Sequence, residues 1–381
     1  AIPALPLTCK LKLYFQTYCL DDQIADSACT ATAYLSGVKN NYATIGVTGD
    51  VPRHDCEAST DTSTHLDSIA VWALADGRDA GIVTNTRITH ASPAGVYARI
   101  AERDWENDRE VLLDQQDPTV CRDIAHQLIH TSPGNQLKVI LGGGRREFLP
   151  NTTQDEESTY GRRTDNLNLI QDWQTEKASR NLDHKYIWSR TELLSLMDSP
   201  PEYTLGLFED THIPYHLEAG PEEPTLVELT EFAIRSLNRN EKGFFLFVES
   251  GRIDHMLRKK TGVSLLKRNG YYEVVYFMCT LSGQNSRNSF NLFSEDTQWM
   301  THAEVYLDSE THGGEDVAVF ATGPYHHMFS GLYEQSQIPL LMAYAACIGP
   351  GLHACSSGAL PHPLALPIYF IAFVLLHGLL R

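Results

Sequence analysis

The chain has 381 residues, long enough to bury a substantial core in one large domain or in two smaller ones. Its 48 acidic and 30 basic residues give a formal net charge of −18. A surface of this charge repels phosphate backbones, which argues against nucleic acid as a partner but leaves room for a local cationic pocket that binds one phosphate.

The first patterned segment is IADSACTATAYLSGVK, residues 24–39. In it Ser27 follows an aspartate and opens a run of small residues that can start a helix. A serine is a weak nucleophile unless a base or a metal activates it. Because no G-x-S-x-G motif surrounds Ser27, acyl transfer by a serine triad has little support.

Helical and strand patterns alternate between about residues 60 and 142. The segment 64–81 has the spacing of a helix that ends near Gly77, and a strand pattern follows at 81–86. The predicted buried face of this helix consists of Leu66, Ile69, Ala70 and Ala73. A second amphipathic helix, with Ile124 and Leu128 one turn apart, is predicted at 120–130, and a short apolar strand at 138–141. LGGGRR at 141–146 then predicts a glycine turn with a structural role.

The alternation resumes before residue 249. A T-x-x-E capping box from Thr225 to Glu228 predicts the start of a helix, which leads into the apolar strand FFLFVE at 244–249. Helices that alternate with apolar strands predict an α/β fold, with a central, largely parallel sheet flanked by helices. In such sheets the chemistry gathers at the carboxyl ends of the strands.

Polar groups follow several of the predicted strands. They are THAS at 89–92, ERDWEND at 102–108, ESGRIDH at 249–255 and ETHGGEDVAVF at 310–320. Together their carboxylates, hydroxyls and imidazoles suit zinc and magnesium. The sequence therefore predicts that a metal activates Ser27.

Two segments fall outside the alternation. Residues 259–300 have no clear period, and we interpret them as a loop or a foreign insert between two well-patterned parts. Residues 356–381 begin with small residues and continue through a short spacer into a hydrophobic tail, a pattern typical of a GPI-attachment signal. A buried C-terminal helix and a transmembrane anchor are the alternatives. A GPI signal implies the secretory pathway and a signal peptide that is not visible before Ala1. The N-x-T sequon at Asn151 agrees with that route.

Several long motifs resemble the alkaline phosphatases of animals, in the same order along the chain. They are DSACTATAYLSGVK, RITHASPAGVYA, AERDWEND, VILGGGRREF, GFFLFVESGRIDH, ETHGGEDVAVFATGP and AYAACIG. The resemblance covers roughly residues 12–258 and 303–355. It implies an alkaline phosphatase-like three-layer sandwich, with residues 1–355 as one domain and 259–300 as a divergent or mis-spliced segment inside it.

The resemblance also implies a mechanism: hydrolysis of phosphate monoesters through a phosphoserine, assisted by two zinc ions and one magnesium ion. Ser27 matches the nucleophile, which also contacts the second zinc, and Arg103 matches the arginine that clamps the phosphate oxygens. The implied magnesium ligands are Ser92 and Glu249, with His90 beside them, and the implied ligands of the first zinc are Asp254 and His312.

Further features are implied by the same resemblance. Phe208, Glu209 and Glu223 resemble a peripheral calcium site. Of the eight cysteines, Cys56 with Cys121 and Cys347 with Cys355 match disulfides of the family, whereas Cys9, Cys19, Cys29 and Cys279 match none. A homodimer, anchored by GPI to the cell surface, is also implied.

The match has three gaps. A G-D-G segment and a T-A-D-H segment of the family, which supply metal ligands, have no counterpart here, and Arg258 stands where the family has a zinc-binding histidine. An arginine cannot ligate zinc. Two hypotheses follow: an alkaline phosphatase, with activity impaired to some degree, and a catalytically inactive surface protein that kept the scaffold. A sulfatase or phosphodiesterase on a related scaffold is a weaker third.

Overall fold

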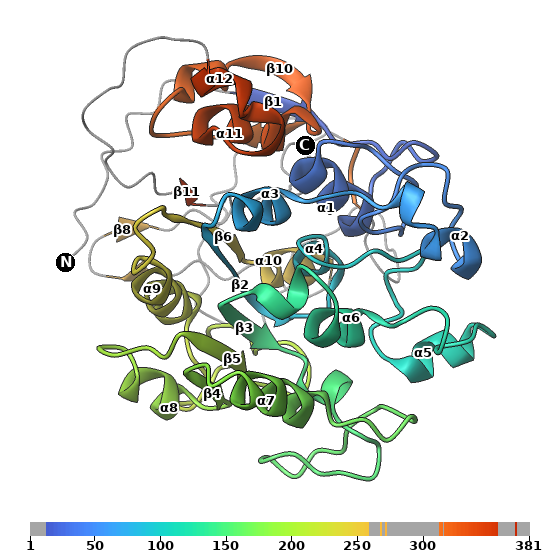
Figure 1. The fold of residues 1–381 in the computed structure, drawn as a ribbon, viewed down its shortest axis with the longest axis vertical. Helices are drawn as coiled ribbons and strands as arrows, with labels where there is room; N and C mark the ends of the chain where they lie inside the picture. The colour runs from blue at the N-terminus through green and yellow to red at the C-terminus, as the bar shows by residue number, and fades with distance from the viewer. Residues whose placement is uncertain are drawn as a thin grey trace, which may run out of the picture.

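The computed structural model describes residues 13–258, 312–314 and 316–356, together with the backbone of three two-residue strands, β7 (Lys267–Arg268), β8 (Tyr271–Tyr272) and β11 (Phe370–Ile371). A parallel sheet in the order β11-β6-β2-β3-β5-β4 runs through the molecule (Figure 1). Its longer strands are β2 (Asp79–Arg87), β3 (Val139–Gly143), β4 (His184–Ile187), β5 (Tyr203–Leu207) and β6 (Phe244–Glu249). The predicted α/β fold with a parallel sheet is confirmed.

Helices cover both faces of this sheet, and in Figure 1 α9 lies on one side of β2 while α1 and α3 lie on the other. The helices are α1 (Ser27–Ser36), α2 (Cys56–Thr60), α3 (Ile69–Ala75), α4 (Ala91–Ala94), α5 (Asp108–Leu113), α6 (Ile124–His130), α7 (Leu169–Ser179), α8 (Arg190–Ser195), α9 (Leu226–Leu237), α10 (Arg252–Arg258), α11 (Gln337–Ala346) and α12 (His353–Ser356). Short 3-10 turns occupy Thr62–Thr64, Gly134–Gln136, Arg145–Phe148, His326–Met328 and Gly349–Gly351.

The strands divide their side chains between two buried clusters. Along β6, Phe245 and Phe247 join the larger cluster, which also takes in α1, α3, α6 and α11. Phe244, Leu246 and Val248 point the other way, into the cluster formed with α8 and α9. This alternation is the period of a strand that is buried on both faces, and it produces three layers.

The predicted helix starts are mostly confirmed. Thr225 and Glu228 form the expected reciprocal capping box at the start of α9. In α3, however, the helix begins after Ser68. Leu66 therefore precedes the helix, and the prediction that it belongs to the buried face of this helix is wrong. Ser68 directs its hydroxyl to the carbonyl of Val96, so this N-cap ties the helix start to a neighbouring segment.

A smaller sheet lies beside the main one and contains β1 (Leu13–Gln16). This strand pairs in parallel with β10 (Gly331–Glu334) and antiparallel with β9 (Val317–Val319). Strands from the two ends of the described chain therefore meet here. Within the described residues, no single helix is long and apolar enough to span a membrane, and one bent pair, Gln337–Ala346 with Gly349–Cys355, satisfies the length and composition of a span.

Candidate active site

One pocket collects residues from distant parts of the sequence. It encloses about 620 Å³ of empty space, part of which is open to solvent. The segments after β2 and β6, the first turns of α1 and α10 and the segment before β9 all contribute to its lining. Six residues singled out from the sequence line it: Ser27, His90, Ser92, Glu249, Asp254 and His312.

Ser27 is the first residue of α1, as its run of small residues predicted. Asp26 caps this helix, because its carboxylate accepts the N–H of Cys29 at 3.1 Å. The side chains of α1 are small and almost all are buried, so the helix packs closely against α4 and α11. The helix start faces the pocket, where unpaired backbone N–H groups suit an anion.

Arg103 is held by two neighbours, one of which is Asp26, the residue before Ser27. Its Nη1 donates to the buried carboxylate of Asp26 at 2.9 Å, and its Nη2 lies 3.2 Å from Nε2 of His90. The backbone of Arg103 also donates to the carbonyl of Ala43 at 2.9 Å. A guanidinium fixed in this way presents a rigid fork of donors, which suits phosphate oxygens.

Glu249 ends β6 and lies across from the end of β2. Its Oε2 accepts hydrogen bonds from the hydroxyls of Thr84 at 2.7 Å and Thr86 at 3.1 Å, and Ser92 also hydrogen-bonds its carboxylate. Burial raises the pKa of Glu249, and the three hydroxyls oppose that rise. A carboxylate surrounded by hydroxyls offers the all-oxygen ligands that magnesium prefers.

Asp254 and His312 meet in the same pocket. Nε2 of His312 lies 3.2 Å from Oδ1 of Asp254, although 58 positions separate the two residues in the sequence. One imidazole and one carboxylate are a donor set that suits zinc. Arg258 ends α10 one turn after Asp254, and its side chain lies outside the described residues.

Three histidines gather at the pocket, which His90 and His255 line, and one ring nitrogen of each of His90, His212 and His255 lies within 4.8 Å of the others. An arginine faces each of them. Nη1 of Arg87 lies 2.7 Å from Nε2 of His212, and the backbone N–H of Arg87 lies 3.0 Å from Nδ1 of the same ring. Arg103 faces His90, and Nη1 of Arg252 lies 3.1 Å from Nδ1 of His255. Burial, and then Arg87, lower the pKa of His212 to about 2. The same positive surroundings disfavour a metal cation between these rings and favour an anion.

The three residues of the implied calcium site lie elsewhere. Phe208 and Glu209 follow β5, and Glu209 shares its surroundings with Glu157 and Glu223. Burial, followed by these two carboxylates and Asp210, raises the pKa of the Glu209 carboxyl to about 8. The sequence analysis did not single out Glu157 as a neighbour.

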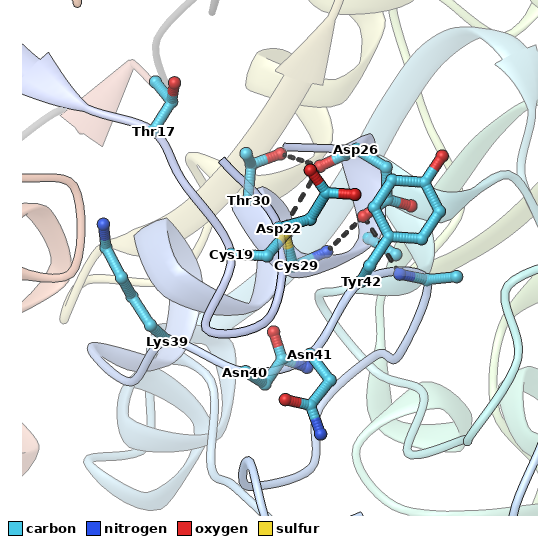
Figure 2. Close-up of a disulfide and its surroundings, with 12 residues drawn as sticks. Thr17, Cys19, Asp22, Asp26, Cys29, Thr30, Lys39, Asn40, Asn41 and Tyr42 are labelled. Atoms are coloured by element: carbon cyan, nitrogen blue, oxygen red, sulfur yellow. Dashed lines mark hydrogen bonds between the residues drawn. A yellow bond between two sulfur atoms is a disulfide. The ribbon is translucent and has the colours of Figure 1, made fainter. Parts of the chain in front are cut away.

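Disulfides join Cys56 to Cys121 and Cys347 to Cys355, the pairs that the resemblance implied. A third disulfide joins Cys19 to Cys29 (Figure 2). The resemblance left these two cysteines unassigned, so their pairing was not predicted. Cys9 and Cys279 lie outside the described residues, and Asn151 is exposed in a turn.

Sequence motifs missed four residues that the fold brings to the site. Thr84, Thr86 and His212 contact predicted site residues or arginines near them, and His255 lines the pocket beside Asp254. Thr84 and Thr86 lie near the end of a predicted strand, so the rule that chemistry gathers at carboxyl ends of strands could have found them. His212 follows β5, a strand that was not predicted from the sequence.

Comparison with known proteins gives this arrangement a family. The family model "Alkaline phosphatase" matches residues 8–277 and 280–348. The chain belongs to the alkaline phosphatase family. It is 50% identical to the membrane-bound alkaline phosphatase of Bombyx mori over 423 residues, which cover 95% of this chain and 77% of that protein. It is 38% identical to the tissue-nonspecific isozyme of Gallus gallus, over 94% of this chain and 81% of that protein.

A solved structure agrees on the fold. The alkaline phosphatase of the Antarctic bacterium TAB5 superposes with a TM-score of 0.56 at 18% identity, covering 89% of each chain. Together the family and its named relatives make this chain an alkaline phosphatase, a phosphomonoester hydrolase of a metal-dependent family. They lend no support to the hypothesis of an inactive relative.

Proposed function

We propose that the chain hydrolyses phosphate monoesters through a covalent phosphoserine at Ser27. One observation carries the proposal: four separate segments of the chain line a single pocket, and they carry Ser27, Ser92, Glu249 with Asp254, and His312. Singly, each is a common residue in an ordinary role. Their convergence is what a site for two-metal phosphoryl transfer requires.

In the proposed reaction Ser27 Oγ attacks phosphorus, the bond to the alcohol oxygen breaks, and the alcohol leaves. Water then attacks the phosphoserine, frees inorganic phosphate and restores the serine. Arg103, fixed by Asp26 at 2.9 Å, orients two phosphate oxygens during both steps. The N–H groups at the start of α1 stabilise the same charge.

The side chains present supply some of the family's metal ligands, whereas the G-D-G, T-A-D-H and histidine ligands named above have no counterpart. We assign zinc to Asp254 and His312, which already meet at 3.2 Å, with Ser27 as a ligand of a second zinc. Magnesium is assigned to Ser92 and Glu249, with His90 as a neighbour of the phosphate. When bound, the ions supply Lewis acidity that stabilises the serine alkoxide and the leaving oxygen.

The peripheral site is assigned to calcium. Calcium takes carboxylate and carbonyl oxygens, and Glu209, Glu223 and the carbonyl of Phe208 offer both. The pKa of Glu209, raised to about 8 by burial and then by neighbouring carboxylates, supports the assignment, because a divalent cation relieves that repulsion.

Membrane attachment through GPI, N-glycosylation at Asn151 and a homodimer complete the proposal. The Bombyx mori relative is named as membrane-bound, which supports cell-surface attachment. Release of the protein from expressing cells by a phosphatidylinositol-specific phospholipase tests the anchor, and retention on the cells contradicts it.

A trapping experiment tests the proposed mechanism. The chain is mixed with a chromogenic phosphomonoester in the presence of zinc and magnesium. The reaction is then quenched in acid, and the mass of the protein is measured by intact mass spectrometry. We expect a phosphate adduct on Ser27, lost in Ser27→Ala. Ser250→Ala is the matched control, since Ser250 lines the same pocket and has no proposed role. An adduct that survives in Ser27→Ala overturns the assignment.

A further inference from the structure

The Cys19–Cys29 disulfide encloses the proposed nucleophile in a short covalent loop. Cys29 lies in the first turn of α1 and Cys19 lies ten positions earlier, so Asp26 and Ser27 are both inside the loop that the bond closes. Both sulfur-bearing side chains are buried, at 2% and 1% exposure. Figure 2 shows the disulfide beside Asp26 and Tyr42.

Asp26 is the group inside this loop on which the site depends. One carboxylate oxygen accepts the N–H groups of Cys29 and Ala43, each at 3.1 Å, and the other accepts Nη1 of Arg103 at 2.9 Å. The carbonyl of Ala43 in turn accepts the N–H of Arg103. The position of the phosphate-orienting guanidinium therefore follows the position of the Asp26 backbone.

The segment that carries Asp26 is fixed by the disulfide together with hydrogen bonds, among them Leu20 N–H to the carbonyl of Asn40 at 3.0 Å and Tyr42 N–H to the carboxylate of Asp21 at 2.7 Å. Residues 17–26 form no helix or strand. Their apolar support is a small cluster of Cys19, Ala25 and Cys29, packed against Tyr42 and separate from the two large cores. Without the bond between the two cysteines, small side chains, one half-buried ring and a few hydrogen bonds are left to oppose the entropy of the loop.

The other end of the bond leads to the small sheet. Cys19 follows β1 by three residues, and β1 pairs with β9, which begins five residues after His312. Gln335 adds to this link by donating its side-chain amide to the carbonyl of Thr17 at 3.1 Å. The disulfide thus joins the start of α1 to the sheet that holds the segment of His312.

We propose that the Cys19–Cys29 disulfide is a positioning element for phosphoryl transfer, which fixes Asp26 and, through it, the phosphate-orienting guanidinium of Arg103. The inference rests on the proposed function of Ser27 and Arg103. Because the bond is buried, it acts as a permanent clamp in the folded enzyme.

Paired serine variants test the proposal against a built-in control. The Cys19→Ser/Cys29→Ser variant removes this clamp, and Cys56→Ser/Cys121→Ser removes a buried disulfide that closes a loop 65 positions long. In the chain-entropy account the longer loop stabilises the fold more. A merely structural role therefore predicts the larger loss of both stability and phosphate affinity in the Cys56/Cys121 variant.

The positioning role predicts the opposite order for phosphate affinity. We expect the inhibition constant for inorganic phosphate to rise about 10- to 100-fold in the Cys19/Cys29 variant, as for a group displaced by about 1 Å, and to change less than about threefold in the control. Equal changes in both variants, or an unchanged constant in the Cys19/Cys29 variant, overturn the proposal. If the double variant does not fold, Cys19→Ser alone breaks the bond, keeps the native residue in α1 and is held to the same thresholds.

Hydrogen exchange separates this inference from the proposed function. In the Cys19/Cys29 variant we expect the amides of Cys29 and Ala43 to exchange at least about tenfold faster, with β2 and β6 unchanged. If the wild type shows no Ser27-dependent turnover, the proposed function fails, while local loosening at these amides still supports a clamp on Asp26. Unchanged exchange at both amides overturns the clamp even in an active enzyme.

Discussion

Replacing Asp26 with asparagine changes the carboxylate that holds Arg103 by substituting an amide nitrogen for one of its two oxygens. Asparagine keeps a carbonyl oxygen. This oxygen can still accept the N–H groups of Cys29 and Ala43, which in the wild type lie 3.1 Å from one carboxylate oxygen of Asp26. Its amide nitrogen then takes the place of Oδ2 and presents hydrogens to Nη1 of Arg103, which lies 2.9 Å from that oxygen. A strong ion pair becomes a contact between two donors.

The cost follows from the burial of this pair. Asp26 is 1% exposed and the side chain of Arg103 18%, so solvent screens the pair only weakly. A hydrogen bond to a charged group contributes about 1.5–3 kcal/mol, and an orphaned partner adds to the loss. If ~2–3 kcal/mol falls on phosphate binding, affinity for inorganic phosphate drops about 30- to 150-fold.

Competitive inhibition of phosphomonoester turnover by inorganic phosphate measures this effect, and urea unfolding reports any loss of stability separately. Asp22→Asn is the matched control, because Asp22 is an exposed carboxylate in the same disulfide loop, and among the described residues its side chain accepts one hydrogen bond, from the N–H of Ile24. An inhibition constant for Asp26→Asn within about threefold of wild type refutes the account of how Arg103 is held.

Three further predictions concern other parts of the molecule. Glu228→Gln should lower the free energy of unfolding by about 1 kcal/mol at pH 7, as for a lost helix cap. The pKa of the Glu228 carboxyl is lowered to about 2, first by Arg190, so the stabilisation from this carboxylate is present above pH 4.5 and disappears as the pH falls through 2. The free energies of unfolding of the wild type and the variant, measured in urea, should therefore converge over that range, and a constant difference between them contradicts this. Gly251→Ala should destabilise the fold by about 1–3 kcal/mol, measured by thermal unfolding, because its Cβ would lie 2.5 Å from Cγ2 of Thr86; an unchanged melting temperature argues against this tight turn. Glu209→Gln should remove the increase in melting temperature that calcium gives the wild type, and an increase retained in full would place calcium elsewhere.

Much of the fold could be predicted from local patterns. The capping box at Thr225, the strand at 244–249 and the helix at Ile124 all follow from residues near one another in the sequence. The failure at Leu66 has a tertiary cause, because Ser68 directs its hydroxyl to the carbonyl of Val96 and the helix starts one turn later than the apolar spacing indicated.

The site could be predicted only as a set of residues. Motif matching named Ser27, Glu249 and His312, but their convergence on one pocket depends on tertiary packing between strands and helices that the sequence does not encode locally. The missed pairing of Cys19 with Cys29 has the same origin. Their Cα atoms lie 5.7 Å apart only because the segment before α1 folds back on the helix, and cysteine spacing alone does not determine connectivity.

The most direct test of the central claim is the turnover of a chromogenic phosphomonoester at alkaline pH by this chain with added zinc and magnesium. The account predicts turnover that disappears on treatment with EDTA, returns when the metals are restored, and is absent from Ser27→Ala while Ser250→Ala retains it. Turnover that persists in a folded Ser27→Ala protein, or a folded wild type without metal-dependent turnover, would contradict it.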